Sequence, residues 1–149
     1  MALTLINSLG AETYTRLIEI WGSAVTATHH FLAPEHYAYF EDSLPGYFPN
    51  LELTGAHVDG HLVGYSATTP SSLEMLFVHA NARGQGVGTA LLGEALVRYP
   101  DLKLAVNEQN PDARKFYERH GFAITHRDDV DGFGFPYPIL HMARRLSRG

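Results

Sequence analysis

The sequence contains no cysteine, which excludes disulfide bonds, thiolate metal sites and a cysteine nucleophile. No apolar run approaches the roughly 20 residues that span a bilayer, and the N-terminus lacks the basic-then-apolar pattern of a secretory signal. Positive charge is also scarce, because 11 lysines and arginines face 16 aspartates and glutamates and leave a net charge of −5. We therefore expect a cytoplasmic protein without general attraction to nucleic acid or acidic membranes, so any anion site must be local.

The rest of the composition is typical of a globular protein. Apolar residues make up 45% of the 149 residues, and charged residues make up 18%. A chain of this length can bury a hydrophobic core without disulfides or metals to hold it together. We expect one domain that spans residues 1–149.

Hydrophobic periodicity and turn residues predict the element order β-α-α-β-β-β-α-β-α-β-β. The predicted strands and helices are strands 2–6, 51–58, 61–68, 73–78, 102–106, 122–127 and 139–146, and helices 10–28, 34–44, 87–99 and 111–120. Pro45, Gly46 and Pro49 are expected to end the second helix, and Asp59-Gly60 to form a type I′ hairpin turn. The helix between strands 73–78 and 102–106 implies that these strands are parallel neighbours. The predicted fold class is α/β, with a mixed sheet and helices on both faces.

A glycine-rich turn, RGQGVG at residues 83–88, lies between a predicted strand and a predicted helix. Such a turn holds phosphate, because its amides and the helix N-terminus face the anion. A Walker A loop is excluded, since the turn contains no lysine. A Rossmann fingerprint is excluded as well, since it needs a third glycine where Thr89 or Leu91 stands.

The pattern that remains, Arg-x-x-Gly-x-Gly followed by Thr89, resembles the acetyl-CoA motif of the GNAT superfamily of N-acetyltransferases. The segment VNEQNPDARKFYERHGF at residues 106–122 is similar to the second cofactor-contacting segment of that family, and the element order also matches. The segments ATHHFL and PYPIL resemble the bacterial YjaB-type subgroup more narrowly. The resemblance implies a GNAT-like fold whose central parallel strands are splayed apart.

The same resemblance implies an enzyme that transfers the acetyl group of acetyl-CoA directly to a primary amine, without a covalent enzyme intermediate. The amine could belong to a small molecule, a protein lysine or a protein N-terminus. A different class of function also fits the two motifs, namely a non-catalytic acetyl-CoA-binding sensor or partner module. In the family, pairing through the C-terminal strands is common, so a homodimer is expected.

The resemblance further implies how acetyl-CoA is held. Amides of the turn would ring the pyrophosphate, and the strand at 73–78 would pair with the pantetheine arm. That strand is bulged in the family, which would free an amide to polarise the acetyl carbonyl. Asn110 would bond the arm, cap the following helix, or do both. The implied cofactor-binding residues are Leu76, Phe77, Val78, Arg83, Gly84, Gln85, Gly86, Val87, Gly88, Thr89, Asn107, Asn110, Ala113, Phe116 and Tyr117.

Two residues are implied as catalytic. Tyr117 matches the family's general acid, which protonates the leaving thiolate, although a tyrosine beside Phe116 could equally pack in the core. Glu74 stands where several family members carry a base, and its alternative is a solvent-facing glutamate. Strand alternation predicts Glu74 on the same face as Leu76. His79 is the alternative base.

The acceptor amine is expected to lie between the first two helices and the loop before the last strand. Aromatic and titratable residues gather there in the sequence: Trp21, His29, His30, Phe31, Tyr37 and Tyr137. Aromatic rings attract ammonium groups, so a cationic acceptor is favoured. Ordinary core packing is the alternative reading for each of these residues.

The nine histidines raise the question of a metal. His57 and His61 are four residues apart, but the hairpin turn between them would pair His57 with Leu62 and His61 with Val58. The two histidines would then point to opposite faces of the sheet. The sequence therefore predicts no metal site.

Overall fold

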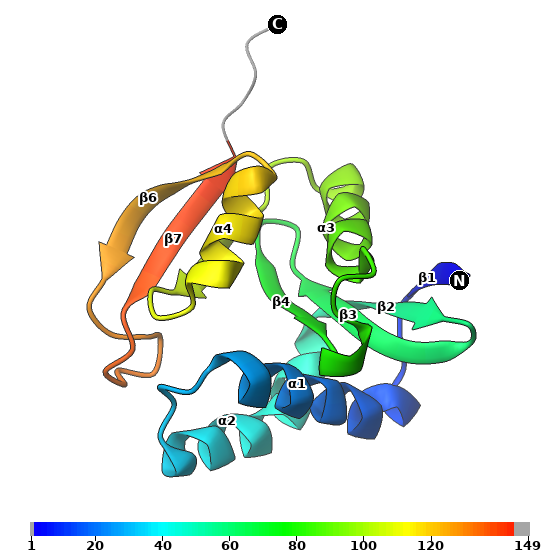
Figure 1. The fold of residues 1–149 in the computed structure, drawn as a ribbon, viewed down its shortest axis with the longest axis horizontal. Coiled ribbons are helices and arrows are strands. Elements are labelled where there is room, and N and C mark those ends of the chain that lie inside the picture. Colours follow the sequence, from blue (N-terminus) through cyan, green and yellow to red (C-terminus); the bar gives the residue numbers. More distant parts are fainter. Residues whose placement is uncertain (1, 145–149) are drawn as a thin grey trace, which may run out of the picture.

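The structure, a computed structural model, describes residues 2–144. In chain order its elements are β1 (Leu3–Asn7), α1 (Tyr14–Thr28), α2 (Pro34–Tyr47), β2 (Glu52–Val58), β3 (His61–Thr68), β4 (Leu73–Val78), α3 (Val87–Arg98), β5 (Lys103–Asn107), α4 (Pro111–Arg119), β6 (Phe122–Asp128) and β7 (Ile139–Arg144). The predicted order of strands and helices is confirmed (Figure 1). The predicted end of the last strand, at residues 145 and 146, lies outside the described residues.

The strands form two sheets rather than the single mixed sheet that the sequence predicts. The first has the order β1-β2-β3-β4 and the second the order β5-β7-β6, and every pairing within them is antiparallel. The central strands β4 and β5 are joined only by a parallel bridge between Ser72 and Lys103. Beyond this bridge β5 pairs with β7 over its whole length, so β4 is left as an edge strand. The expected splay is present, and it is large enough to divide the sheet.

The turn between β2 and β3 forms as predicted. Asp59 has φ +50° and Gly60 has φ +84°, the two positive values that a type I′ turn requires. Val58 pairs with His61, and His57 pairs with Leu62. Local turn chemistry therefore sets the register of this hairpin.

Pro45 does not end α2, contrary to the sequence prediction. The helix runs through Pro45 to Tyr47 and continues as a 3₁₀ turn over Phe48–Asn50. Leu44 and Phe48 lie one helical turn apart and are both buried, at 4% and 1% exposure. Burying two large apolar side chains contributes roughly 3–6 kcal/mol, which offsets the hydrogen bond that proline cannot donate.

Helices cover both faces of the first sheet, as predicted (Figure 1). On one face, α1 buries Leu17, Ile20 and Trp21 against the sheet, and α2 buries Leu44 in the same cluster. On the other face, Val87 and Leu91 of α3 pack against Ala56.

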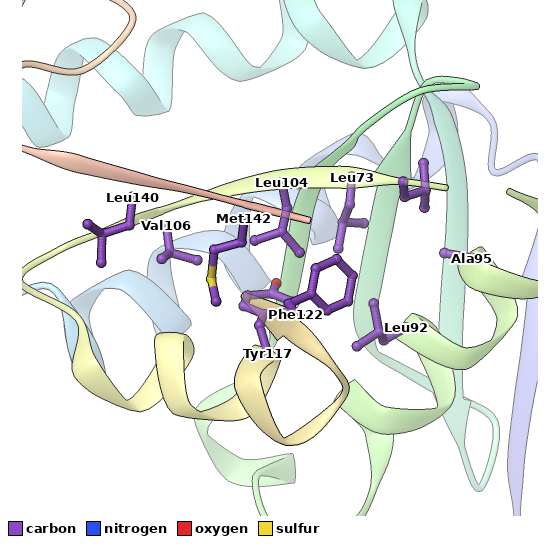
Figure 2. Packing of buried hydrophobic residues seen from close by; sticks show 10 residues of the cluster. Leu73, Leu92, Ala95, Leu104, Val106, Tyr117, Phe122, Leu140 and Met142 are labelled. Carbon is purple, nitrogen blue, oxygen red and sulfur yellow. The ribbon is translucent and has the colours of Figure 1, made fainter. Parts of the chain in front are cut away.

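The helix α4 covers the second sheet and shares a core with α3. Tyr117 of α4 lies in this cluster with Phe122, Leu140 and Met142 (Figure 2). Leu92 of α3 closes the same cluster from the side of the first sheet. The two sheets are therefore held together by side chains of α3 and α4 rather than by strand pairing.

Within residues 2–144, the structure contains no helix with the length and apolar character to cross a membrane.

Candidate active site

A wide cleft of about 510 Å³ opens where β4 and β5 part. It is lined from α1 and its C-cap by Ala24, Thr28 and His29, from β4 by Leu76, Phe77 and Val78, from the glycine turn and α3 by Ala82, Arg83, Gly84, Gly86, Val87, Gly88 and Thr89, and from α4 and its N-cap by Asn110, Asp112, Ala113, Lys115, Phe116, Tyr117 and Arg119. Of the residues predicted to bind the cofactor, all but Gln85 and Asn107 line this cleft. Segments that are distant in sequence thus form one continuous wall.

The glycine turn has the backbone that its sequence predicts. Gly84 and Gly86 have φ +77° and +78°, values that only glycine adopts without strain. Gly86 is the N-cap of α3 and offers no side chain to cap the helix. The first amides of α3 therefore have no capping partner from that residue, and the helix dipole adds positive potential at the cleft.

Three cationic side chains line the wide cleft: Arg83 of the turn, and Lys115 and Arg119 of α4. Asp112 is the acidic residue among the lining side chains. In a protein of net charge −5, this cleft is a local positive region, as an anion site requires. The sequence analysis did not identify Lys115 and Arg119, although their spacing of four residues on one helical face was a readable signal.

Tyr117 serves the core and the cleft together. Its ring packs edge-on against Phe116 and Phe122, at centroid distances of 5.1 and 5.8 Å, and Figure 2 shows it within the cluster. The residue is 8% exposed and also lines the wide cleft. Burial raises the pKa of Tyr117 above its ordinary value, so the phenol keeps its proton.

Asn110 caps α4 and also lies at the wide cleft, as predicted. Its side-chain oxygen accepts a hydrogen bond from the Ala113 amide at 3.3 Å and caps α4. The same residue lines the wide cleft. Gly121, with φ +91°, follows the C-terminal end of α4.

A second, aromatic cleft of about 230 Å³ lies between α1, α2, β4 and the loop before β7. It is lined by Trp21, Val25, His29, Leu32, Phe40, Leu44, Tyr47, Glu74, Met75, Phe77, Asn107, Asp131, Phe133 and Tyr137. Its rings and its two carboxylates suit a cation on an aliphatic stem. Phe40, Tyr47, Asp131 and Phe133 were not identified from sequence, because only the packing of the loop on α2 brings them together.

The loop between β6 and β7 is tied to α2. The Tyr137 hydroxyl accepts a hydrogen bond from the Ala33 amide at 3.0 Å and lies 2.5 Å from His36 Nδ1. His36 also stacks on Phe135, with centroids 4.2 Å apart. Asp131 Oδ1 accepts hydrogen bonds from two amides of the loop, which fixes the turn. The wall that Tyr137 provides is therefore anchored to the helix.

Glu74 does not lie on the face that strand alternation predicts. In the β3–β4 pairing Ala67 faces Met75 and Thr68 faces Leu73, so Glu74 has no partner and the register shifts there. Because of this bulge, Glu74 lines the aromatic cleft together with Met75 and Phe77. Its Oε1 accepts a hydrogen bond of 2.7 Å from Ser72 Oγ. Glu74 is exposed and lines the aromatic cleft, so the bulge places this residue on the side of Met75 and Phe77.

The other predicted residues are divided between the clefts. Trp21, His29 and Tyr137 line the aromatic cleft, as does Asn107, which was expected to bind the cofactor. His30 is exposed and lines neither cleft.

Three further predicted residues line neither cleft: Phe31, Tyr37 and His79. Phe31 packs on the Tyr137 ring at 5.8 Å, and Tyr37 packs on Trp21 at 4.9 Å. His79 Nδ1 accepts a hydrogen bond from the Asn81 amide at 3.1 Å, so this histidine caps a 3₁₀ turn.

A separate group of His126, Asp128 and His141 lies on the second sheet, with its candidate ligand atoms within 4.8 Å of one another. The two imidazole rings stack with centroids 4.0 Å apart and an angle of 7°. His141 Nε2 lies 2.7 Å from Asp128 Oδ2. Parallel rings do not aim their lone pairs at a shared point, and the three side chains stack and pair with one another. The sequence gives no local signal for this group, because cross-strand pairing of β6 with β7 assembles it.

Comparison with known proteins decides the family. The family model described as an acetyltransferase (GNAT) domain matches residues 23–137. The chain belongs to the GNAT family of acetyltransferases. As a GNAT enzyme it uses acetyl-CoA as the acyl donor. Residues of both family motifs, the turn at 83–88 and the segment at 106–122, line the wide cleft.

Two curated GNAT relatives are similar over most of their length. The chain is 39% identical over 132 residues to the peptidyl-lysine N-acetyltransferase YjaB of Salmonella typhimurium, which covers 88% of this chain and 91% of the relative. It is 38% identical over 133 residues to YjaB of Escherichia coli, covering 89% and 90% of the two chains. The predicted resemblance to the YjaB-type subgroup is confirmed.

Solved structures agree with this assignment. The solution structure of apo-form YjaB from Escherichia coli superposes with a TM-score of 0.88 at 36% identity, over 96% of this chain and 97% of that chain. The PaiA N-acetyltransferase of Thermoplasma acidophilum, solved in complex with coenzyme A, has a TM-score of 0.78 at 19% identity, over 98% and 100%. The second likeness shows a shared GNAT fold.

Proposed function

We propose that this GNAT enzyme acetylates the ε-amine of lysine side chains in proteins. The observation that carries the proposal is the meeting of two clefts of different character. One is wide and lined by cations and a glycine turn, and the other is aromatic and carries carboxylates. His29 and Phe77 line both. A donor in the first cleft and an amine in the second would therefore meet at these two residues.

The residues of the wide cleft fit acetyl-CoA. Amides of the turn at 83–88 and the N-terminus of α3 would hold the pyrophosphate, and Arg83, Lys115 and Arg119 would neutralise phosphate charge. The free edge of β4 offers backbone groups to the peptide-like pantetheine arm. When bound, acetyl-CoA supplies a thioester already activated toward amines.

The residues of the aromatic cleft fit a lysine side chain. Its aliphatic stem can lie along Trp21, Phe77 and Tyr137, and an ammonium group is attracted by ring faces and by Glu74. Both YjaB relatives are named peptidyl-lysine N-acetyltransferases, which supports the same acceptor class here.

Two side chains are proposed to transfer protons. We assign Glu74 as the base that takes a proton from the amine, because it lines the acceptor side of the junction. We assign Tyr117 as the acid, because it lines the donor side and burial keeps its hydroxyl protonated. With these roles, the amine loses a proton to Glu74 and the leaving thiolate gains one from Tyr117.

Three further proposals concern the setting of the enzyme. A cytoplasmic location fits an enzyme whose donor is a cytoplasmic metabolite, and cell fractionation tests it. The net charge of −5 supports an amine acceptor without nucleic-acid or membrane partners. A homodimer is proposed from the resemblance to the family, and light scattering measures it.

The acceptor class is tested with matched substrates. One peptide carries a single lysine and a blocked N-terminus, a second carries arginine in place of lysine and a free N-terminus, and a third substrate is a small diamine. We expect acetylation of the lysine peptide to exceed that of the other two, measured as free CoA and product mass. Preference for the diamine or the N-terminus would contradict the lysine proposal. Binding of acetyl-CoA without transfer to any amine would instead fit the non-catalytic binding module.

A further inference from the structure

His29 is the hydrogen-bonding residue at the junction of the two clefts. Among the described residues, His29 and Phe77 are the two that line both clefts. Phe77 has no polar side-chain atom, so polar contact between side chain and amine at the junction falls to His29. The amine nitrogen must reach the acyl carbon at this place, where a misaligned lone pair slows the reaction.

The hydrogen bonds of Thr28 favour one tautomer of the His29 ring. Thr28 Oγ1 lies 2.8 Å from the Ala24 carbonyl oxygen and donates its only hydrogen to it. The same oxygen lies 2.7 Å from His29 Nδ1. While its hydrogen points to the Ala24 carbonyl, this oxygen can only accept, which favours an Nδ1–H group on His29. In the neutral ring this leaves Nε2 with a lone pair and no hydrogen.

The ring is held neutral by its surroundings. Burial, and to a smaller extent the neighbouring His30, lower the pKa of His29 to about 4. The titratable groups that share the clefts with His29 come from other elements and are Tyr47, Glu74, Asp131, Tyr137, Arg83, Asp112, Lys115, Tyr117 and Arg119. A neutral imidazole beside an incoming ammonium accepts a hydrogen bond and adds no repulsion.

We propose that His29 Nε2 accepts a hydrogen bond from the acceptor amine and orients its nitrogen toward the junction. This role rests on the proposed lysine acetylation and adds a residue to it. It differs from the role of Glu74, since His29 stays neutral and no proton moves to it. Thr28, at the C-terminal end of α1, thereby orients the His29 ring, and the ring orients the acceptor amine.

Two substitutions at one position separate the two ring nitrogens. Asparagine can keep a donor near the position of Nδ1, toward Thr28, but has no atom at the position of Nε2. Glutamine can place its amide oxygen near the position of Nε2. We expect His29→Asn to raise KM for the lysine peptide about tenfold or more, with KM for acetyl-CoA unchanged. His29→Gln should restore most of the loss. The same change at an exposed histidine outside both clefts, His126→Asn, is the control and should leave KM unchanged.

A second measurement does not depend on turnover. The ¹⁵N chemical shifts of the His29 ring report which nitrogen carries the hydrogen. We expect the Nδ1–H tautomer in the wild-type protein and a mixed population in Thr28→Val, which lacks the accepting oxygen. Adding the lysine peptide together with CoA, which has no acetyl group to transfer, should shift Nε2 and leave Nδ1 in place.

The outcomes distinguish this inference from the proposed function. Wild-type enzyme that acetylates no lysine peptide contradicts the proposed function. Wild-type activity with an equal peptide KM in His29→Asn contradicts the role of His29 alone. An Nε2–H tautomer in the wild-type protein overturns the inference whatever the activity.

Discussion

At the scale of single residues, Tyr117 has to satisfy packing and chemistry together. Removing its hydroxyl leaves the ring contacts with Phe116 and Phe122 in place. We expect Tyr117→Phe to lower kcat on the order of 100-fold or more, the loss typical of a missing general acid. Binding of acetyl-CoA, measured by calorimetry, should be unchanged. Equal turnover of wild type and variant across a panel of amines would remove Tyr117 from the mechanism.

His29 predicts a specific dependence of stability on pH. Its pKa is lowered from 6.5 to about 4 in the folded protein, so the unfolded chain takes up a proton first as pH falls. The contribution is fully present above pH 6.5 and is lost as pH falls toward 4, by up to about 3 kcal/mol. In urea unfolding from pH 7 to pH 4, the stability of the wild-type protein relative to His29→Gln should therefore fall by up to this amount. Parallel pH curves for the two proteins would contradict this.

At the scale of elements, the glycine turn offers two matched substitutions. Gly86 has φ +78° at the N-cap of α3, and Gly93 lies in the interior of the same helix without a positive φ. We expect Gly86→Ala to lower the free energy of unfolding by about 1 kcal/mol and to weaken acetyl-CoA binding. Gly93→Ala should raise stability by about 0.5–1 kcal/mol and leave binding alone. Thermal unfolding with and without acetyl-CoA measures both effects.

A Cβ at either glycine would meet no atom within 4 Å, so a loss of affinity at Gly86 cannot come from a clash inside the protein. Equal acetyl-CoA affinity in the two variants would contradict a role for the turn in phosphate binding.

Elements determined by neighbouring residues were predictable from sequence. The hairpin turn at Asp59 and Gly60 and the Asn110 cap both follow from local backbone chemistry. The end of α2 was not predictable, since burial of Phe48 overrides Pro45. The face of the sheet on which Glu74 lies was not predictable either. One unpaired residue in β4 reverses the alternation of side chains between the two faces.

At the scale of the whole molecule, charge distribution should govern acetyl-CoA binding. Lys115 and Arg119 line the wide cleft of an acidic protein. We expect Lys115→Gln and Arg119→Gln each to weaken acetyl-CoA binding roughly fivefold, equivalent to about 1 kcal/mol, and affinity to fall as salt rises. Lys103→Gln changes an exposed lysine outside both clefts and is the control. Loss of affinity in all three variants alike would show general charge attraction instead of a built site.

The two clefts also show what the sequence leaves open at this scale. Most of the wide cleft comes from β4, the glycine turn and the first part of α4, so most of its lining was predictable, but Lys115 and Arg119 were not identified. The aromatic cleft combines α1, α2, β4 and a loop about 100 residues away from α2 in the chain, as in the pairing of His36 with Tyr137. Such contacts depend on packing between distant segments, which no local pattern encodes.

In the proposed reaction, donor and acceptor meet at His29 and Phe77. The most direct test is a crystal structure with a bisubstrate analogue, in which CoA is joined through an acetyl bridge to the lysine of a peptide. We expect the pyrophosphate to lie on the turn at 83–88, the pantetheine along β4 and the lysine in the aromatic cleft. The bridging carbon should lie beside His29 and Phe77. A peptide bound outside the aromatic cleft, or a bridging carbon away from these two residues, would contradict this meeting point of donor and acceptor.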